Sequence, residues 1–291
     1  MNKFITDNRI KTETNNDYGM KEKYNRYNVN SELLKRVIIR LDYQGMTTVD
    51  SWVTQLKTQN FGNFQRYSRN YLSSSQVRNY RIGEVMDSLN LPDQAIFNEP
   101  LHTFADIELE GHSDMVKMDV ANYFTIIVID CKNYTNIDDF LQLVAHYVEL
   151  LLAFDPFIQI KRIGLRKVSG NEFENTDQIY DVFEKYVIFP NPADHNVLYE
   201  AQSYKDLMYK QDLGVSVNFT RQCREVTVGT KPMVQVLVDI DAYITQKEMD
   251  KRGIKLPNDT QAAMNTINGY MFELFKSCVN EKYLNGRQKT Q

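Results

Sequence analysis

The chain has 291 residues, 42% of them hydrophobic, and a formal net charge of −4, so it can bury a full core and has no global attraction to nucleic acid. No apolar run approaches the ~20 residues of a membrane-spanning helix, and the N-terminus is polar rather than a signal sequence. The three cysteines, Cys131, Cys223 and Cys278, lie far apart and outside any C-x-x-C pair. This pattern predicts a cytoplasmic protein without disulfides or thiolate metal sites.

Residues 1–30 carry almost no apolar periodicity and are predicted to form a mobile N-terminal tail. The next part, residues 31–155, has the pattern of a strand, a helix, a variable segment, three strands and a long helix. Its two helices each show one apolar stripe at helical spacing. The expected elements are a strand at 33–43, a helix at 49–56, strands at 101–110, 114–120 and 123–130, and a helix at 137–154.

The second part, residues 156–291, follows nearly the same order and ends in the clearest amphipathic helix of the chain. The expected elements are a strand at 157–168, helices at 179–186 and 197–207, strands at 213–220, 223–228 and 233–241, and a helix at 267–279. We therefore predict an α+β fold of two antiparallel sheets, each holding its own long helix on its inner face. An internal duplication would explain this order, and chance similarity of element order is the alternative.

The most informative stretch is the strand-like run at residues 158–168, in which Arg162, Gly164 and Arg166 share one face. The apolar phase changes within the run, which predicts either a β-bulge near Lys161-Arg162 or partial burial of both faces. In a functional interpretation, the two guanidinium groups face a groove and receive an acidic partner surface or a phosphate. In a structural interpretation, the glycine admits a packed ring and the arginines pair with carboxylates. The candidate carboxylates are those of Asp42, Asp130, Asp239 and Asp241.

A second candidate surface is the segment at residues 64–81, where arginines alternate with tyrosines and no acid interrupts. This residue mix can grip phosphates and stack on unpaired bases, but tyrosine and arginine also anchor protein interfaces. A structural interpretation is an exposed edge hairpin kept soluble by arginine and serine. The candidate contact residues are Arg66, Tyr67, Arg69, Tyr71, Arg78, Tyr80 and Arg81.

Signatures of catalysis are weak. The sequence contains no G-x-G-x-x-G, no G-x-x-x-x-G-K-[ST] and no G-x-S-x-G motif. His146 and Glu149 stand at i and i+3 of a helix and could hold a metal, but only one such pair exists, so a satisfied polar helix face is the favoured interpretation. Asp239 and Asp241 share a strand face and could bind Mg²⁺, yet no third acid or base accompanies them. We therefore assign no catalytic residue, metal ligand or cofactor.

Three short motifs carry a resemblance to a known family: the run Arg162-Ile-Gly-Leu-Arg166, the strand end Leu237-Val-Asp-Ile-Asp241, and the closing helix with Phe275 and Val279-Asn280. From about Leu33 to Leu284 the chain resembles a sporadically distributed family of uncharacterised prokaryotic proteins. Its members carry a mid-chain Arg-Ile-Gly-Leu-Arg-Tyr-Ile-Asn signature and a Leu-His helix near the end. Here Lys167-Val-Ser169 replaces Tyr-Ile-Asn, and Ile267-Asn268 stands in place of Leu-His. The resemblance implies patchy inheritance of the kind seen for mobile elements and defence loci, and no established activity.

We therefore predict a non-enzymatic interaction protein that binds a protein partner, and the resemblance implies a prokaryotic defence or toxin-neutralising locus as its setting. The alternative is a nucleic-acid-binding protein that uses residues 64–81. A divalent-metal enzyme centred on Asp239 and Asp241 is a more distant alternative. No contact with a membrane is expected, and the sequence alone does not predict the oligomeric state.

Overall fold

The computed structural model describes part of the chain, and all structural statements below concern that part. The described residues are Tyr24 and the ranges 32–72, 99–105, 115–131, 137–187 and 201–286. The predicted mobile tail at residues 1–30 lies outside them apart from Tyr24. The Tyr24 side chain is buried, its hydroxyl donates to the side chain of Asn285, and its carbonyl accepts from Nζ of Lys276 at 3.3 Å. This tyrosine therefore belongs to the folded core.

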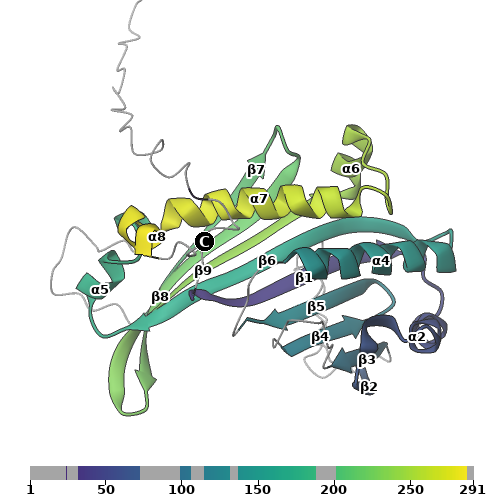
Figure 1. Cartoon of the computed structure of the whole chain (residues 1–291), viewed down its shortest axis with the longest axis horizontal. Helices are drawn as coiled ribbons and strands as arrows, with labels where there is room; N and C mark the ends of the chain where they lie inside the picture. Colours follow the sequence, from purple (N-terminus) through teal and green to yellow (C-terminus); the bar gives the residue numbers. More distant parts are fainter. Residues whose placement is uncertain are drawn as a thin grey trace, which may run out of the picture.

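Nine strands in the described ranges form one antiparallel sheet in the order β2-β3-β4-β5-β1-β6-β9-β8-β7 (Figure 1). The strands are β1 (Leu34–Gln44), β2 (Arg66–Tyr71), β3 (Pro100–Ala105), β4 (Met115–Val120), β5 (Phe124–Asp130), β6 (Gln159–Phe173), β7 (Ala201–Lys210), β8 (Val215–Val228) and β9 (Lys231–Thr245). β2 and β7 are the two edge strands, at opposite ends of the sheet.

The prediction of two separate sheet-and-helix halves is wrong, because β1 and β6 pair with each other across the predicted boundary at residues 155 and 156. Their antiparallel ladder runs from Leu34 opposite Ser169 to Gln44 opposite Gln159. Two separate sheets would each leave one of these long apolar strands with an unpaired edge, and pairing satisfies both rows of backbone groups. The fold is one largely β structure with few helices.

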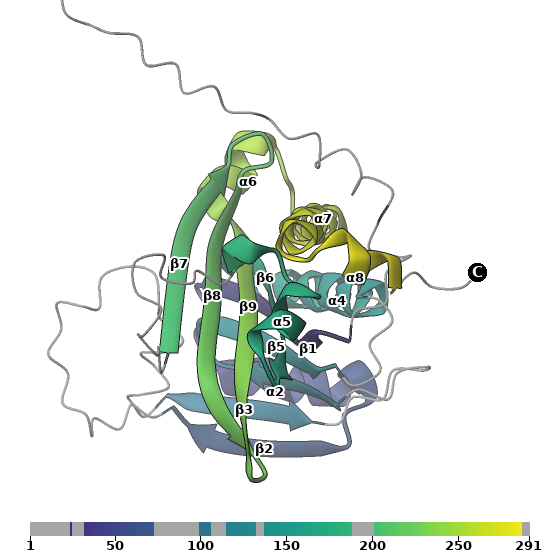
Figure 2. The ribbon, with the colours of Figure 1, turned by 90° about the vertical axis from the view of Figure 1, so that its left-hand side faces the viewer.

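The helices add one layer to the sheet. They are α2 (Val49–Thr58), α4 (Asp138–Phe154), α5 (Thr176–Tyr180), α6 (Gln246–Arg252), α7 (Thr260–Cys278) and α8 (Glu281–Gly286), with short 3-10 turns η2 (Phe61–Asn63) and η4 (Lys185–Val187). The two long helices, α4 and α7, lie on the same side of the sheet and contact each other (Figures 1 and 2). This side is called the helix face below, and the other side the open face.

Alternating side chains of the central strands build the core beneath α4 and α7. On β6, Ile163 and Leu165 are fully buried on the helix face, whereas Arg162, Gly164 and Arg166 lie on the open face. The apolar stripes predicted for the helices at 49–56 and 137–154 are confirmed: the stripe of α2 is buried, and so are six apolar residues at helical spacing in and just before α4. They are Ile137, Phe140, Leu141, Val144, Val148 and Leu151.

The bulge predicted near Lys161 is confirmed. Asp42 of β1 pairs with Arg162, but the next residue, Tyr43, pairs with Ile160, so Lys161 is the extra residue on β6. The bulge explains the change of apolar phase, because Ile160 and Ile163 both become buried although their numbers differ in parity. It also keeps Arg162 in register with the charged residues of the open face.

Three element predictions in the second half are wrong. The helix expected at 197–207 is the edge strand β7, whose exposed faces impose no hydrophobic alternation and whose apolar residues fall by chance at helical spacing. The strands expected at 213–220 and 223–228 are the single strand β8, interrupted in the pattern by a buried Arg221. The helix expected at 179–186 is reduced to α5 followed by the turn η4.

Arg221 occupies a core position of β8, where its charge is neutralised and both terminal nitrogens of its guanidinium donate hydrogen bonds. Its guanidinium donates to Asp206 Oδ2 at 2.8 Å and to the carbonyl of Tyr186 at 2.9 Å. The side chain is only 8% exposed, so the ion pair with Asp206 offsets the cost of burial. A buried charge of this kind is invisible to a hydrophobic pattern.

Candidate interaction surfaces

The arginine strand predicted as a binding site lies in the middle of the open face, and both of its arginines form ion pairs. Nε of Arg162 donates to Asp42 Oδ2 at 2.6 Å, and the other oxygen of Asp42 accepts from Nε of Arg40 at 2.7 Å. Arg166 donates to Asp239 through Nε and Nη2, at 2.9 and 2.6 Å from the nearer oxygens. Two of the four carboxylates named from the sequence are thus the partners of these arginines.

The glycine slot between the arginines is filled by a tyrosine from the neighbouring strand. Gly164 is opposite Tyr243 of β9, and a Cβ on Gly164 would come within 3.1 Å of the Tyr243 Cβ. The Arg162 guanidinium carbon lies 4.9 Å from the Tyr243 ring centroid, a cation–π distance. These contacts match the structural interpretation, and a partner contact at Arg162, Gly164 and Arg166 stays a prediction.

The two carboxylates proposed for a divalent cation are already engaged. Asp239 is bound by Arg166 through both oxygens, and Asp241 accepts from Nδ2 of Asn218 at 3.1 Å. In the ranges that the structure describes, no group of three or more His, Cys, Asp and Glu side chains is placed to hold a metal ion. The pair of His146 and Glu149 is exposed, with 3.5 Å between Nδ1 and Oε2.

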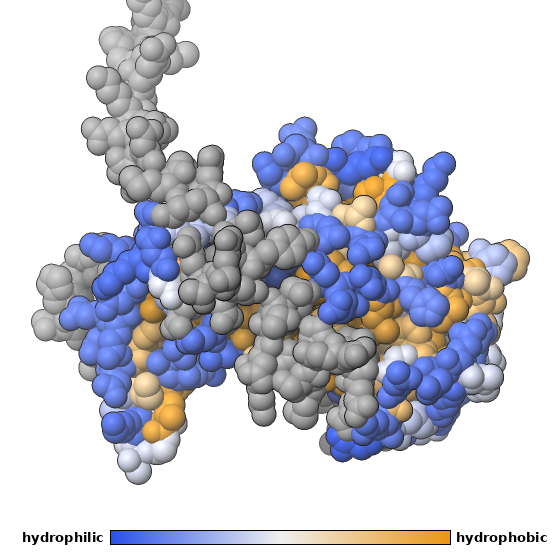
Figure 3. Space-filling view, viewed as in Figure 1, coloured by the Kyte–Doolittle hydropathy of each residue, from blue (hydrophilic) through white to orange (hydrophobic). Residues whose placement is uncertain are grey.

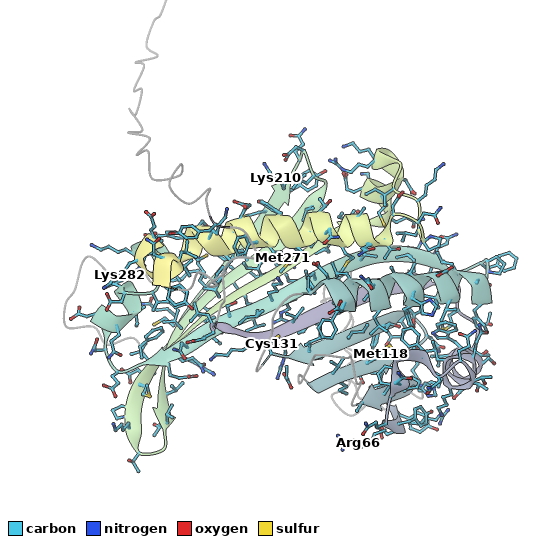
Figure 4. The ribbon with its side chains drawn as sticks, in the orientation of Figure 1. Arg66, Met118, Cys131, Lys210, Met271 and Lys282 are labelled. Atoms are coloured by element: carbon cyan, nitrogen blue, oxygen red, sulfur yellow. The ribbon has the colours of Figure 1, made fainter. Side chains whose placement is uncertain are left out.

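The second predicted surface falls on β2, the edge strand, for the part that the structure describes. All six residues from Arg66 to Tyr71 are exposed, as the edge interpretation expects, and Figure 4 shows Arg66 at the outer end of the sheet. Arg78, Tyr80 and Arg81 lie outside the described residues. The two predicted surfaces are not brought together, because β3, β4, β5 and β1 separate β2 from β6.

Two tyrosines and an arginine of β2 share the helix face with the neighbouring helix α2. Together with two charged residues of that helix they form a surface that we call the α2–β2 surface. Its members are Asp50, Lys57, Tyr67, Arg69 and Tyr71, and His102 of β3 lies beneath them. Tyr67 is 40% exposed and Tyr71 is 53% exposed.

Each exposed side chain of the α2–β2 surface is held by a neighbour. Arg69 donates through Nε and Nη2 to the two oxygens of Asp50 at 3.0 and 3.3 Å, and through Nη1 to the Tyr71 hydroxyl at 2.9 Å. The Tyr67 hydroxyl lies 2.7 Å from Nδ1 of His102, and Nζ of Lys57 lies 3.1 Å from the Tyr67 ring centroid. The hydrogen bond from Arg69 lowers the pKa of the Asp50 carboxyl. The surface is therefore exposed but ordered.

His102 supports this surface from inside the sheet. It is 1% exposed, and its Nε2 lies 3.2 Å from Asp50 Oδ1 without the alignment of a hydrogen bond. Burial lowers the pKa of His102 below its ordinary value of 6.5; Asp50 opposes this effect, and Arg69 and Lys57 add to it. His102 is therefore neutral in the folded protein at neutral pH.

A neutral buried histidine makes stability depend on pH. Because the folded-state pKa of His102 lies below 6.5, its contribution is fully present above that pH and is lost as the pH falls through and below it. We expect urea unfolding midpoints to fall more between about pH 7.5 and about pH 5.5 in the wild type than in His102→Gln, which has no group to protonate there. Equal losses in the two proteins would show that His102 carries no such linkage.

Sequence reasoning missed Asp50, Lys57 and His102, because they are distant in sequence from the segment they hold. It also treated Lys167 and Asn268 only as separate departures from the family pattern. In the structure Nζ of Lys167 donates to Oδ1 of the buried Asn268 at 2.6 Å, joining β6 to α7. The only sequence signal for this contact was that the polar residues stand within apolar stripes.

Comparison with known proteins leaves the chain without relatives that bear on function. No protein-family model matches it, and no curated protein matches it. Among solved structures, DynU16, a protein of the dynemicin biosynthetic locus, is 10% identical over 84% of this chain and 99% of its own, with a TM-score of 0.17. A TM-score this low carries no argument about fold or activity. The resemblance to the uncharacterised prokaryotic family stays a prediction.

Two further findings concern the helices and the cysteines. None of the helices within the described ranges combines the length and hydrophobicity required to cross a membrane. Among the described residues Cys131, Cys223 and Cys278 form no disulfide; the first two are half-buried and the third is buried.

Proposed function

We propose that the chain is a non-enzymatic interaction protein that binds a protein partner through the α2–β2 surface. The observation that carries this proposal is that the exposed Tyr67, Arg69 and Tyr71 are each fixed by a contact within the surface. Tyrosine and arginine dominate the energetics of protein interfaces. Side chains that are already ordered lose little conformational entropy on binding, which favours affinity.

The position of the surface at a sheet edge also supports a protein partner. β2 has one strand neighbour, β3, among the strands that the structure describes, so an extended segment of a partner could add to its outer side. Such a segment would receive main-chain hydrogen bonds from β2 and side-chain contacts from Tyr67, Arg69 and Tyr71. The main-chain hydrogen bonds would then supply affinity for any extended segment, and the side-chain contacts would supply specificity for the partner's sequence.

The nucleic-acid alternative is less well supported. Phosphate binding requires free cations and base stacking requires open ring faces. The Arg69 guanidinium is bound to the Asp50 carboxylate, and the Lys57 ammonium covers one face of the Tyr67 ring. Nanomolar binding of RNA or DNA that weakens steeply with salt would favour this alternative over a protein partner.

The central arginine strand is a weaker candidate for the partner site. Arg162 is 17% exposed and shares Asp42 with Arg40, so a partner would have to break a half-buried ion network. Arg166 is more accessible, at 47% exposed, but is bound to Asp239 at both oxygens. We therefore assign Arg162 and Arg166 a structural role rather than a binding role.

The setting of the protein is part of the same proposal. Free thiols at all three cysteines suit a reducing compartment, and we place the protein in the cytoplasm. The resemblance implies a defence or toxin-neutralising locus, in which the partner would be a protein encoded nearby. Neither statement depends on the geometry of the α2–β2 surface.

Replacing Arg69 and Tyr71 by alanine is expected to abolish capture of the partner from the native host. Loss of an anchoring arginine or tyrosine typically weakens binding by about 2 kcal/mol or more, roughly thirtyfold. Both residues are exposed, so the free energy of unfolding should change little. The measurement is co-purification with a tagged wild-type chain and with the double variant.

The matched control is Phe157→Ala, which removes an aromatic side chain that is 80% exposed and lies in the turn before the central strand β6. Capture should be the same with this control as with the wild type. A partner that binds the double variant as well as it binds Phe157→Ala would overturn the assignment of the surface.

A further inference from the structure

The edge strand β7 at the other end of the sheet exposes three large hydrophobic or aromatic side chains. It runs from Ala201 to Lys210, and β8 is its one neighbour among the strands in the described ranges. Leu207 is 75% exposed, Tyr209 is 48% exposed and Tyr204 is 39% exposed. Figure 2 shows β7 at the left of the sheet, with β8 and β9 between it and α7. A long edge of this kind is a template for pairing with another chain.

We propose that a second copy of this chain occupies this edge, with the two β7 strands paired antiparallel about a two-fold axis at Leu207. A two-fold dimer uses the same patch on both copies. The axis is perpendicular to the joined sheet, so it keeps each residue on its own face. Residues can therefore face each other only when they share a face, which places the axis at a residue and not between two residues.

Charge decides between the possible registers. An axis at Lys205 would place two lysines opposite each other, and an axis at Asp206 would place two aspartates opposite each other. Directly opposite like charges destabilise an antiparallel pair. With the axis at Leu207, residues 204–210 pair and no like charges face each other. The facing pairs are Leu207 with Leu207, Lys205 with Tyr209, Tyr204 with Lys210, and Asp206 with Met208.

This register forms its most favourable side-chain contacts on the open face. Leu207 meets its own copy at the axis, and on each side the ammonium of Lys205 meets the ring of Tyr209, an arrangement suited to a cation–π contact. The most exposed apolar side chain of the strand is thereby removed from water on both copies. Lysine on an edge strand usually prevents pairing, but here each lysine faces a tyrosine.

The registers with the axis at Tyr204 or at Met208 also avoid like charges but fit less well. An axis at Tyr204 places Leu207 opposite the small side chain of Ala201 and leaves Tyr209 outside the ladder, so it covers less apolar surface. An axis at Met208 shortens the ladder to residues 206–210, because the turn at residues 211–214 follows. Of these registers, the one with the axis at Leu207 both avoids facing like charges and buries the most apolar side-chain surface.

The helix face of β7 is compatible with the same dimer. Asp206 is already neutralised by Arg221 at 2.8 Å, so its position opposite Met208 leaves no unpaired charge. Figure 4 shows Lys210 at the end of the sheet opposite from Arg66, so the dimer leaves the α2–β2 surface accessible on both copies. The dimer does not depend on the proposed function of that surface.

The experiment is sedimentation equilibrium of the full chain over micromolar concentrations, with Leu207→Asp as the test variant. The wild type is expected to dimerise, and Leu207→Asp, which places two carboxylates at the axis, is expected to weaken dimerisation by about tenfold or more. The matched control is Val228→Asp, which places a charge at a half-exposed valine at the end of β8, outside β7, and should leave the dimer intact. A monomeric wild type, or an unweakened Leu207→Asp dimer, would overturn the proposal.

Crosslinking tests the register independently of any folding defect. In a background of Cys131→Ser and Cys223→Ser, a short thiol-reactive crosslinker should join two copies of Leu207→Cys, because facing residues lie ~5 Å apart. Under the same conditions Tyr204→Cys should not crosslink at this spacing. Crosslinking of Tyr204→Cys in preference to Leu207→Cys would contradict the axis at Leu207.

Discussion

Replacing Asp42 by alanine is expected to destabilise the folded protein by about 3 kcal/mol, as loss of one partner from a buried ion pair does. The Asp42 carboxylate is shared by Arg40 and Arg162, whose side chains are only 19% and 17% exposed. Burial lowers the pKa of Arg40, and the charge of Arg162 acts in the same direction, while Asp42 opposes both. Without Asp42, two cations would face each other in a partly buried site.

The matched control is Asp239→Ala on the same face of the sheet. Its partner Arg166 is 47% exposed and can be solvated when the carboxylate is removed, so the expected loss is ~1 kcal/mol or less. Urea unfolding followed by circular dichroism gives both free energies of unfolding. Equal losses in the two variants would show that the Asp42 network is not a buried structural element.

Replacing Trp52 by alanine is expected to cost about 3–5 kcal/mol of stability, the range for deletion of a large buried aromatic side chain. Trp52 is fully buried between α2 and α4, with its ring centroid 5.5 Å from that of Tyr147 and 5.3 Å from that of Phe154. Its Nε1 donates to the Tyr147 hydroxyl at 2.9 Å, and that hydroxyl also lies 2.6 Å from Thr125 Oγ1. The substitution removes packing and breaks this buried network.

Thermal or urea unfolding measures the effect of Trp52→Ala, and Phe157→Ala serves as the control because Phe157 is 80% exposed. The control should change the free energy of unfolding by no more than ~0.5 kcal/mol. A loss below ~1 kcal/mol for Trp52→Ala would mean that α2 does not pack on the core as described.

Much of the secondary structure could be predicted from the sequence, because an element that is buried on one face has apolar residues at regular spacing. The stripes of α4 and α7 and the alternation of β1 and β6 predicted their elements, and the change of apolar phase at Lys161 predicted the bulge. Periodicity failed where burial did not set the residue type. β7 is exposed on both faces, and β8 carries the buried charge of Arg221.

The order of the strands in the sheet could not be predicted from hydrophobic spacing. An apolar face shows that a strand is covered but not which strand is its neighbour, so the hydrophobic pattern did not predict the pairing of β1 with β6. The sequence feature that pointed to it was charge, because Asp42 of β1 was a candidate partner of the β6 arginines. Hydrophobic residues are also exposed along the β8–β9 hairpin, at the lower left of Figure 3. Exposed positions of this kind are the ones that patterns describe least well.

The sequence predicted part of the α2–β2 surface but not all of it. Arginine and tyrosine at residues 66–71 indicated an exposed edge strand, and the edge is observed. The groups that order it come from elsewhere: Asp50 and Lys57 from α2, and His102 from β3. Only the fold brings them within contact, and it is this ordering that distinguishes a binding surface from a solvated charged strand.

The most direct test of the proposed binding surface is hydrogen exchange of the chain with and without its captured partner. We expect partner binding to slow amide exchange in α2 and β2, residues 49–71, and to leave the arginine strand at residues 159–168 unchanged. Protection confined to residues 159–168, or no protection in α2 and β2, would contradict the assignment of partner binding to the α2–β2 surface.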